Sequence, residues 1–412
     1  MKKLIIILNI LAAPIFLFVA CEDRPDGYEF PVDEYVYEIP DVPVTEDYVV
    51  GVPYETKYRD TTYHIWWDAG KKAHQLYTGK PTLGEYDLRE DADVLRQHLD
   101  WGKEAGIDFF ILGWGGRGFN DTILMNWEKL YAQDNARPKV VIRFDPGYRF
   151  KGKDTLQYML PTMDSLRFDF DSVYAHIMMH DFAYKKKDGK PVMVFGNFTN
   201  TGQIPRVNDF ITFLKSSPTV NNNIWLMAEL GSTWASPEQW GFNQTNGYSA
   251  GPQYGYVRPD SIKPFDAFYI TNTTHSSYDR YYSQYSYLDY NYRYWQERMR
   301  PLGKEYIPTV VPSFDNRIDE PTSDVFFIPR WKEGAGQGAY IISDTIGGQY
   351  NFSNFTENPY KTWANVAKRN VGESRIIMVY NWNDFRLGRN LEPTVECGTD
   401  YLRYTREFFK KQ

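Results

Sequence analysis

Residues 375–393 read RIIMVYNWNDFRLGRNLEP, and this stretch decides how we interpret the chain. Its apolar first part is typical of a strand that is buried on both faces of a parallel sheet. Amides, aromatic rings and the carboxylate of Asp384 follow at the point where such a strand would end. Folds with parallel strands collect their functional groups at the carboxyl ends of those strands. The stretch therefore predicts a functional role for Asp384, with a loop cap that only binds backbone N–H groups as the alternative.

Apolar runs like this one alternate with helical patterns along most of the chain. The long segments 232–264 and 315–358 are rich in Gly, Asn, Tyr and Pro and read as elaborated loops, although the short run 339–343 competes for a place among the strands. The alternation predicts an α/β fold, namely a single (β/α)8 TIM barrel over residues 59–412 with its elaborated loops on the carboxyl face. The expected strands are 62–67, 107–114, 139–145, 191–197, 224–230, 266–272, 306–314 and 375–383, and the expected helices are 91–105, 123–132, 155–184, 207–214, 285–302 and 400–410.

The amino terminus has the pattern of an export signal. Two lysines precede a short apolar run that ends in a small residue and Cys21, so residues 1–21 predict a lipoprotein signal peptide with Cys21 as the lipidated residue of a lipobox. Phe18 departs from the leucine that is usual there, and an ordinary signal peptide cleaved near Ala20 is the alternative. The acidic pair after Cys21 resembles the export signal of Bacteroidetes surface lipoproteins. We therefore expect an exported protein anchored by lipid to the bacterial outer membrane and exposed at the cell surface, with residues 22–58 as an extended tether.

Composition narrows the classes of partner. The 46 Lys and Arg against 53 Asp and Glu give a formal net charge of -7, and the basic residues are scattered, which argues against a nucleic-acid partner. Aromatic residues make up 17% of the chain, with 33 Tyr and 12 Trp, which suits stacking on sugar rings; ordinary core packing is the alternative. We expect a monomer that binds carbohydrate.

Motifs for metals and cofactors are weak or absent. The two cysteines are too few for a cysteine zinc site, and His176 and His180 are better explained as one face of a helix. Residues 113–118 match GxGxxG formally, but they follow the second strand rather than the first, so we interpret them as a barrel loop in which Trp114 approaches a ligand. We expect no metal and no cofactor.

Four carboxylates end apolar runs. They are Asp145, Glu229, Asp315 and Asp384, and in a barrel such positions converge on one site. Hydrolysis of a glycosidic bond needs one carboxyl group as proton donor and a second as nucleophile or base. The sequence therefore predicts catalytic roles for members of this group, while a structural role remains the alternative for each of them.

Several of these stretches together resemble a known family. Residues 63–67 (YHIWW), 84–87 (GEYD), 113–116 (GWGG) and 307–316 (IPTVVPSFDN) are similar to successive blocks of glycoside hydrolase family 99, the endo-α-mannosidases, and of its WbsX-like and family 71 relatives. Residues 383–393 (NDFRLGRNLEP) resemble that family's pattern NEWHEGTQIEP. The resemblance covers roughly residues 63–408 and implies a barrel that acts on glycans. The residues that we expect to contact the sugar are Tyr63, Trp66, Trp67, Trp114, Arg143, Trp382, Asn383 and Arg386.

The departures from this pattern fall on the chemistry. The family's first glutamate, a base toward the sugar 2-hydroxyl, is matched by the shorter Asp384, and its second, the general acid, is matched by Leu387. Leucine has no proton to donate, and loss of a positioned acid costs roughly 10²- to 10⁴-fold in rate. Three interpretations follow: a divergent glycoside hydrolase with another acid, a surface protein that binds glycan without cutting it, or a lyase or transferase acting on carbohydrate.

Overall fold

The computed structural model describes most of the chain between residues 37 and 412. The described residues are 37–56, 67–68, 73–74, 79–116, 118, 120–146, 155–196, 207–230, 263–271, 284–314, 330–331 and 358–412. Among them, no helix is both long and apolar enough to cross a membrane.

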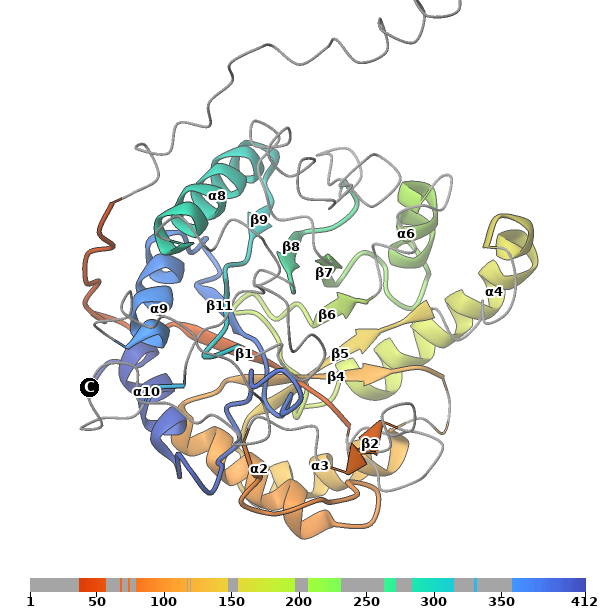
Figure 1. The fold of residues 1–412 in the computed structure, drawn as a ribbon. Helices are drawn as coiled ribbons and strands as arrows, with labels where there is room; N and C mark the ends of the chain where they lie inside the picture. Colours follow the sequence, from red (N-terminus) through yellow and green to blue (C-terminus); the bar gives the residue numbers. More distant parts are fainter. Residues whose placement is uncertain are drawn as a thin grey trace, which may run out of the picture.

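Nine strands within the described residues form one parallel sheet that curls into an α/β barrel (Figure 1). Their order in the sheet is β10-β11-β1-β4-β5-β6-β7-β8-β9. β9 and β10 are separated only by Ile307 and Pro308, so the two ends of this order lie in one continuous segment, residues 305–310. The strands are β1 (Val49–Tyr54), β4 (Phe109–Trp114), β5 (Lys139–Phe144), β6 (Val192–Phe195), β7 (Trp225–Leu230), β8 (Ala267–Ile270), β9 (Glu305–Tyr306), β10 (Thr309–Val310) and β11 (Ile376–Val379).

Helices lie around the outside of the strands (Figure 1). Most connect successive strands, as the sequence alternation predicts. α9 was not predicted, although Asn358 accepts a hydrogen bond from the Tyr360 N–H as its N-cap and Pro359 occupies the first turn, which is a recognisable start signal. The helices are α2 (Ala92–Ala105), α3 (Asp121–Gln133), α4 (Thr155–Val173) with the π-helical turn η3 (Tyr174–Met178), α6 (Val207–Lys215), α8 (Gln284–Met299) with the 3₁₀ turn η8 (Arg300–Leu302), α9 (Pro359–Arg369) and α10 (Asp400–Phe409).

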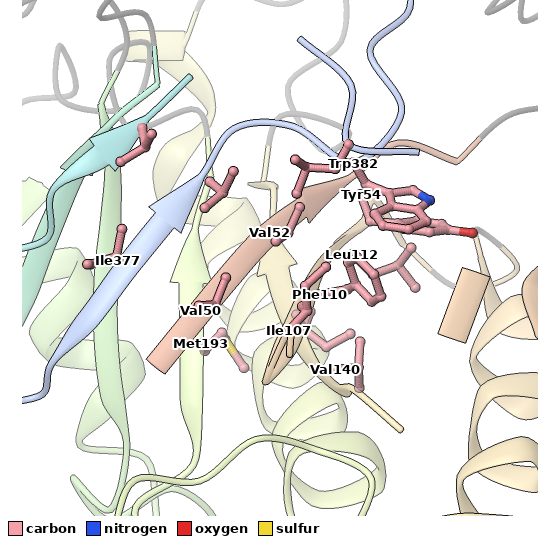
Figure 2. Packing of buried hydrophobic residues seen from close by; sticks show 14 of the residues in the cluster. Val50, Val52, Tyr54, Ile107, Phe110, Leu112, Val140, Met193, Ile377 and Trp382 are labelled. Atoms are coloured by element: carbon pink, nitrogen blue, oxygen red, sulfur yellow. The ribbon is translucent and has the colours of Figure 1, made fainter. Parts of the chain in front are cut away.

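Alternate residues of each strand belong to different cores because successive side chains point to opposite faces of a sheet. In β4, Phe109 and Ile111 join the smaller cluster inside the barrel, whereas Phe110 and Leu112 join the larger cluster between sheet and helices. Figure 2 shows part of the larger cluster, including Val50, Val52 and Tyr54 of β1. The barrel interior is tightly packed: a Cβ on Gly51 would lie 2.4 Å from the Phe109 ring.

The structure corrects the predicted start of the folded domain. We expected a first strand at residues 62–67 and a tether over 22–58. Instead, β1 (Val49–Tyr54) pairs with β11 on one side and β4 on the other. Residues 62–66 lie outside the described residues, and Trp67 belongs to β2 (Trp67–Asp68), which pairs with β3 (Ala73–His74) in a separate antiparallel sheet. The glycine and proline inside β1 weaken its strand signal, and only its pairing on both sides makes up for them.

The segment before β1 is also attached to the domain. The Tyr37 hydroxyl donates to the Asp289 carboxylate at 2.7 Å, and Lys368 of α9 donates to the Val42 carbonyl at 2.6 Å. The part of the expected tether that the structure describes is therefore bound along α8 and α9. Six of the other predicted strands are confirmed with shorter bounds, whereas the predicted strand 306–314 is replaced by two short strands, β9 and β10. The expected loops at 232–262, 315–329 and 332–357, including the run 339–343, lie outside the described residues.

Candidate functional site

The side chains that face the barrel interior are apolar along most of each strand and become polar at the carboxyl end of the barrel. Val141 of β5, Met227 of β7 and Met378 of β11 all belong to the interior cluster. Two residues further along each strand, on the same face, come Arg143, Glu229 and Tyr380. The top of the interior is thus lined by charged and phenolic groups instead of aliphatic ones. We call the cluster formed by Glu55, Arg143, Glu229, Tyr269, Tyr380, Asp384 and Arg389 the mouth cluster.

Glu229 is the most densely bonded carboxylate of this cluster. Its Oε1 and Oε2 each accept from Arg143 Nε at 2.8 Å, and Oε1 also accepts from Arg143 Nη2 at 2.5 Å. The Tyr269 hydroxyl donates to Oε2 at 2.8 Å. Burial, and then the neighbouring Glu229 charge, raise the pKa of Tyr269 well above its ordinary value, so this phenol stays a donor. β5, β7 and β8 together hold Glu229 in one orientation.

Arg143 lies on β5 and Glu229 on β7, so the arginine side chain has to cross the end of β6. It can do so because the residue directly after β6 is a glycine, Gly196. A Cβ built on Gly196 would lie 2.8 Å from the guanidinium carbon of Arg143. On its other side, Arg143 Nη1 lies 3.5 Å from Asp145 Oδ2. Burial is the largest single influence and lowers the pKa of Arg143, but the charge of Glu229, its hydrogen bonds and smaller effects of Tyr269 and Asp145 together raise this pKa. Two of the predicted carboxylates, Asp145 and Glu229, therefore share one arginine.

Asp384 has an arginine of its own. Its Oδ2 accepts from Arg389 Nε at 2.7 Å and lies 2.5 Å from Arg389 Nη2, while Oδ1 accepts from the Leu387 N–H at 3.3 Å. Arg389 also lies over the Tyr380 ring, 4.7 Å from its centroid. Burial raises the pKa of Tyr380, with smaller raising effects from Glu229, Glu55 and Asp384 against the lowering effect of Arg389. Asp384 thus lies after β11, as predicted. It also accepts a bond from a loop N–H, which is the contact that the alternative interpretation expected.

A buried polar network lies directly behind the mouth cluster. Glu392 is fully buried, accepts from the Tyr86 hydroxyl at 2.7 Å and lies 3.2 Å from His98 Nε2. Asn383 donates to Tyr86 at 3.1 Å. The same amide pairs with the backbone of Glu55, accepting from its N–H and donating to its carbonyl, each at 2.9 Å. This network joins the loop after β11 to the end of β1.

Burial corrects part of the predicted sugar-binding set. Trp382 and Asn383 are fully buried, and Trp114 is 4% exposed. Trp114 stacks on Phe144 at a centroid distance of 5.7 Å, on the helix-facing side of the sheet, because even-numbered residues of β4 point outward. These three side chains pack within the protein and offer no face to a sugar. Arg386, by contrast, is exposed.

Other predicted positions are not described. Tyr63, Trp66, Asp315 and Cys21 lie outside the described residues, and only the backbone of Trp67 is described. Their predicted roles stay predictions. Within the part of the chain that the structure describes, no group of three or more His, Cys, Asp or Glu side chains is placed to hold a metal ion. His176 lies in η3, whereas His180 follows that helix and pairs with Glu128 at 2.7 Å, so the predicted shared helix face is wrong.

Sequence reasoning missed four members of the mouth cluster. Tyr269 sits inside an apolar run and looked like core, and Tyr380 looked like the end of one. Arg389 stands where the family pattern has threonine, so the substitution was visible, but its pairing with Asp384 was not. Glu55 was hidden because the strand before it was taken for a tether. Period-two alternation from the correct β1 would have found it.

Comparison with solved structures finds proteins with a similar fold. A structure described as a glycoside hydrolase-like protein matches with a TM-score of 0.62 and 18% identity, over 92% of this chain and 99% of the other. The GH99 endo-alpha-mannosidase from Bacteroides thetaiotaomicron matches with a TM-score of 0.58 and 15% identity, over 88% and 97% of the two chains. The barrel is GH99-like. No protein-family model and no curated protein sequence matches the chain.

Proposed function

We propose that this protein is a divergent glycoside hydrolase that acts on a polysaccharide or glycan. The observation that carries the proposal is the mouth cluster, in which side chains from β5, β7, β8 and the loop after β11 bring Glu229 and Asp384 to the same end of a GH99-like barrel. Barrel enzymes build their active sites at this end. Two carboxylates there are the minimum equipment for cleaving a glycosidic bond.

The contacts of the carboxylates suggest which tasks they can perform. A guanidinium favours the ionised form of the carboxylate that it contacts. Arg143 contacts Glu229 and Asp145, and Arg389 contacts Asp384. These groups suit an anionic role, as base, as nucleophile or in stabilising a cationic transition state. Leu387 is half-buried and packs against the core, so the proton donor has to come from another position.

We also infer that β9 and β10 are two halves of one strand, which would give the barrel eight strands. The residues between them support this, because the Ile307 N–H bonds the Phe268 carbonyl of β8 and the Pro308 carbonyl accepts from the Met378 N–H of β11.

Carbohydrate is the proposed partner. We further propose a monomer held by a lipid on Cys21 at the outer membrane and exposed at the cell surface, as the amino-terminal signal predicts.

The test is a screen of the purified protein against α-mannans and a broad set of plant and host glycans, with released reducing ends and binding measured side by side. Wild type should release sugar, and both Glu229→Gln and Asp384→Ala should lower the release roughly 100-fold or more. Glu90→Gln is the matched control, since Glu90 is exposed in a turn before α2. Release that survives both site variants would contradict the proposed roles.

A second function has its own observation in support. Arginines pair with the carboxylates of Asp145, Glu229 and Asp384, so a barrel that binds glycan without cutting it fits these contacts as well. In that case no glycan would be cut, and a bound glycan would be retained by Asp384→Ala. A lyase or a transferase acting on carbohydrate would give different products. In neither reaction does water supply the oxygen of a new reducing end.

A further inference from the structure

Two members of the mouth cluster directly follow a residue of the buried polar network. Tyr54, the last residue of β1, precedes Glu55, and Asn383 precedes Asp384. The side chains of Tyr54 and Asn383 are both buried. The network therefore holds the two chain segments from which the carboxylates of Glu55 and Asp384 extend.

The bonds of this network converge on the carboxylate of Glu392. Its Oε2 accepts from the Tyr86 hydroxyl at 2.7 Å, and its Oε1 lies 3.2 Å from His98 Nε2. The other ring nitrogen of His98, Nδ1, lies 2.8 Å from the Tyr54 hydroxyl oxygen. Asn383 donates to the Tyr86 oxygen at 3.1 Å. One carboxylate is thus connected to both chain segments, to the first through an imidazole and to the second through a phenol.

The two phenols of the network keep their protons. Burial, followed by the charge of Glu392, raises the pKa of both Tyr54 and Tyr86 well above the ordinary value. The Tyr86 hydroxyl therefore stays a donor to Glu392, and this bond fixes the direction of the hydroxyl group. The same oxygen then offers its lone pair to the amide of Asn383 at a defined place.

This network is a poor device for stability alone. Glu392 and His98 are fully buried, and it is expensive to take an ionisable group out of water. Apolar side chains of similar size at such positions often stabilise a fold equally well or better. Hydrogen bonds add something that apolar packing does not, because they set a length and a direction between two points of the chain. Here these two points directly precede members of the mouth cluster.

From this arrangement we propose that Glu392 and Tyr86 are positioning residues that fix the place of Asp384 at the mouth of the barrel. They act through Asn383, whose amide accepts from the Glu55 N–H and donates to its carbonyl, each at 2.9 Å. A shift of Asn383 moves the next residue, Asp384, relative to the rest of the mouth cluster. The effect of such a shift on the rate rests on the proposed hydrolase function, whereas the place of Asp384 does not.

The experiment begins with Tyr86→Phe in the full-length protein. This change removes the hydroxyl that joins Glu392 to Asn383 and keeps the ring. On the glycan that the screen identifies, we expect kcat to fall about 10- to 100-fold, because a misplacement of about 1 Å has an effect of this size. KM should stay within about twofold of wild type, since the proposed task of Asp384 lies in the transition state.

Tyr174→Phe is the matched control. The hydroxyl of Tyr174 donates to the Asn223 carbonyl at 2.9 Å and accepts from the Asn223 side chain at 3.1 Å, so it also gives one bond and receives one. Tyr174 is buried and lies in η3, and Asn223 precedes β7 at the amino end of the barrel. Tyr174→Phe should lower the melting temperature about as much as Tyr86→Phe and leave kcat at the wild-type level.

A double-mutant cycle with Asp384→Ala shows whether Tyr86 acts through Asp384. Once the carboxylate is gone, Tyr86→Phe has nothing left to misplace, so it should change the remaining kcat by less than about twofold. The same loss in both backgrounds would show a general structural role and overturn the inference, as would a wild-type kcat in Tyr86→Phe alone. Glu392→Gln keeps the size of the side chain but is a weaker acceptor, and it should give the same pattern.

Crystal structures of wild type and Tyr86→Phe separate the inference from the proposed function. We expect the Asp384 carboxylate to move by about 0.5 Å or more relative to Glu229, which is the tolerance of a working site. An unmoved carboxylate would overturn the inference whether or not the wild type cuts glycan. A wild type that releases no sugar, together with a moved carboxylate in Tyr86→Phe, would overturn the proposed hydrolase function alone.

Discussion

The two ends of the barrel both carry ion pairs on strand ends, but they use them differently. At the amino end, Lys410 Nζ donates to the Tyr48 carbonyl at 2.6 Å and to Asp108 Oδ2 at 2.7 Å, and the same carboxylate oxygen accepts from the Val50 N–H at 2.7 Å. At the carboxyl end, Arg143 and Arg389 bond carboxylates of other side chains. The first pair ties main-chain groups together and the second set arranges side chains.

This difference indicates what each end does. Bonds to main-chain groups hold β1, β4 and α10 in register, so the amino end closes the barrel. Bonds between side chains leave the backbone unaffected and set the direction of carboxylates, so the carboxyl end prepares a site. Removing a charge should therefore cost mainly stability at the amino end and mainly activity at the carboxyl end. The first four of the following five predictions test that contrast.

The largest effect is expected at Glu229. Glu229→Gln keeps the size of the side chain and its bond to Tyr269 but removes the charge that faces Arg143. We expect glycan cleavage to fall roughly 10²- to 10⁴-fold. Initial rates on the glycan identified by the screen measure this, with thermal unfolding recorded for the same sample. Unchanged cleavage would show that the charge of Glu229 has no part in the reaction.

A loss of stability is expected at Lys410. Lys410→Met removes two hydrogen bonds and leaves the Asp108 carboxylate without its cation, which should lower the free energy of unfolding by about 2 kcal/mol. Urea denaturation measures this, and activity per folded molecule should stay at the wild-type level. Lys411→Met is the matched control, because Lys411 is exposed.

The pH dependence of the Lys410→Met variant has a definite sign. Burial raises the pKa of Asp108 above its ordinary value even though Lys410 lowers it, so loss of Lys410 raises this pKa further. A raised carboxyl pKa in the folded state destabilises above the unfolded pKa and not below it. The deficit should be largest near neutral pH and shrink as the pH falls toward about 4. A deficit that grows on acidification would contradict this account.

A smaller effect on activity is expected at Gly196. In Gly196→Ala the new Cβ would lie 2.8 Å from the guanidinium carbon of Arg143, so the arginine must shift away from its place against Glu229. We expect cleavage to fall about tenfold, because displacements well under 1 Å already matter in a site. Gly113→Ala is the control, since no atom lies within 4 Å of its Cβ position. Equal rates for the two variants would show that Arg143 is not held by this contact.

The smallest effect is expected at Lys368, in the last turn of α9. Burial lowers the pKa of Lys368 from 10.5 to about 8. Between these values the unfolded chain binds more protons than the folded one, so this lysine makes stability rise with pH over that window. Lys368→Met should remove this pH dependence, which changes the free energy of unfolding by about 1 kcal/mol or less over the window. Urea denaturation at several pH values measures it, with Lys187→Met as control because Lys187 is exposed; a slope that persists would exclude Lys368 as its source.

The site shows how far sequence reasoning reached. The run before Asp384 predicted a buried parallel strand, and β11 confirms it, whereas the functional role of Asp384 stays a prediction. Glu229 was predicted as a carboxylate at a strand end, and it lies there. Asn383 and Trp382 were predicted to contact sugar, yet both are fully buried. The sequence shows that a residue follows a strand, but the direction of its side chain depends on the loop that the strand enters.

The sequence by itself determined the α/β alternation, six of the predicted strands and the resemblance in residues 383–393, because these depend on local periodicity and residue type. Only the tertiary structure decided that residues 49–54 are the first strand, that Arg389 pairs with Asp384 and that Glu55 joins the mouth cluster. β1 has a weak local signal and is stabilised by partners that begin at Phe109 and Ile376. Contacts between residues so distant in the chain exist only once the sheet has curled.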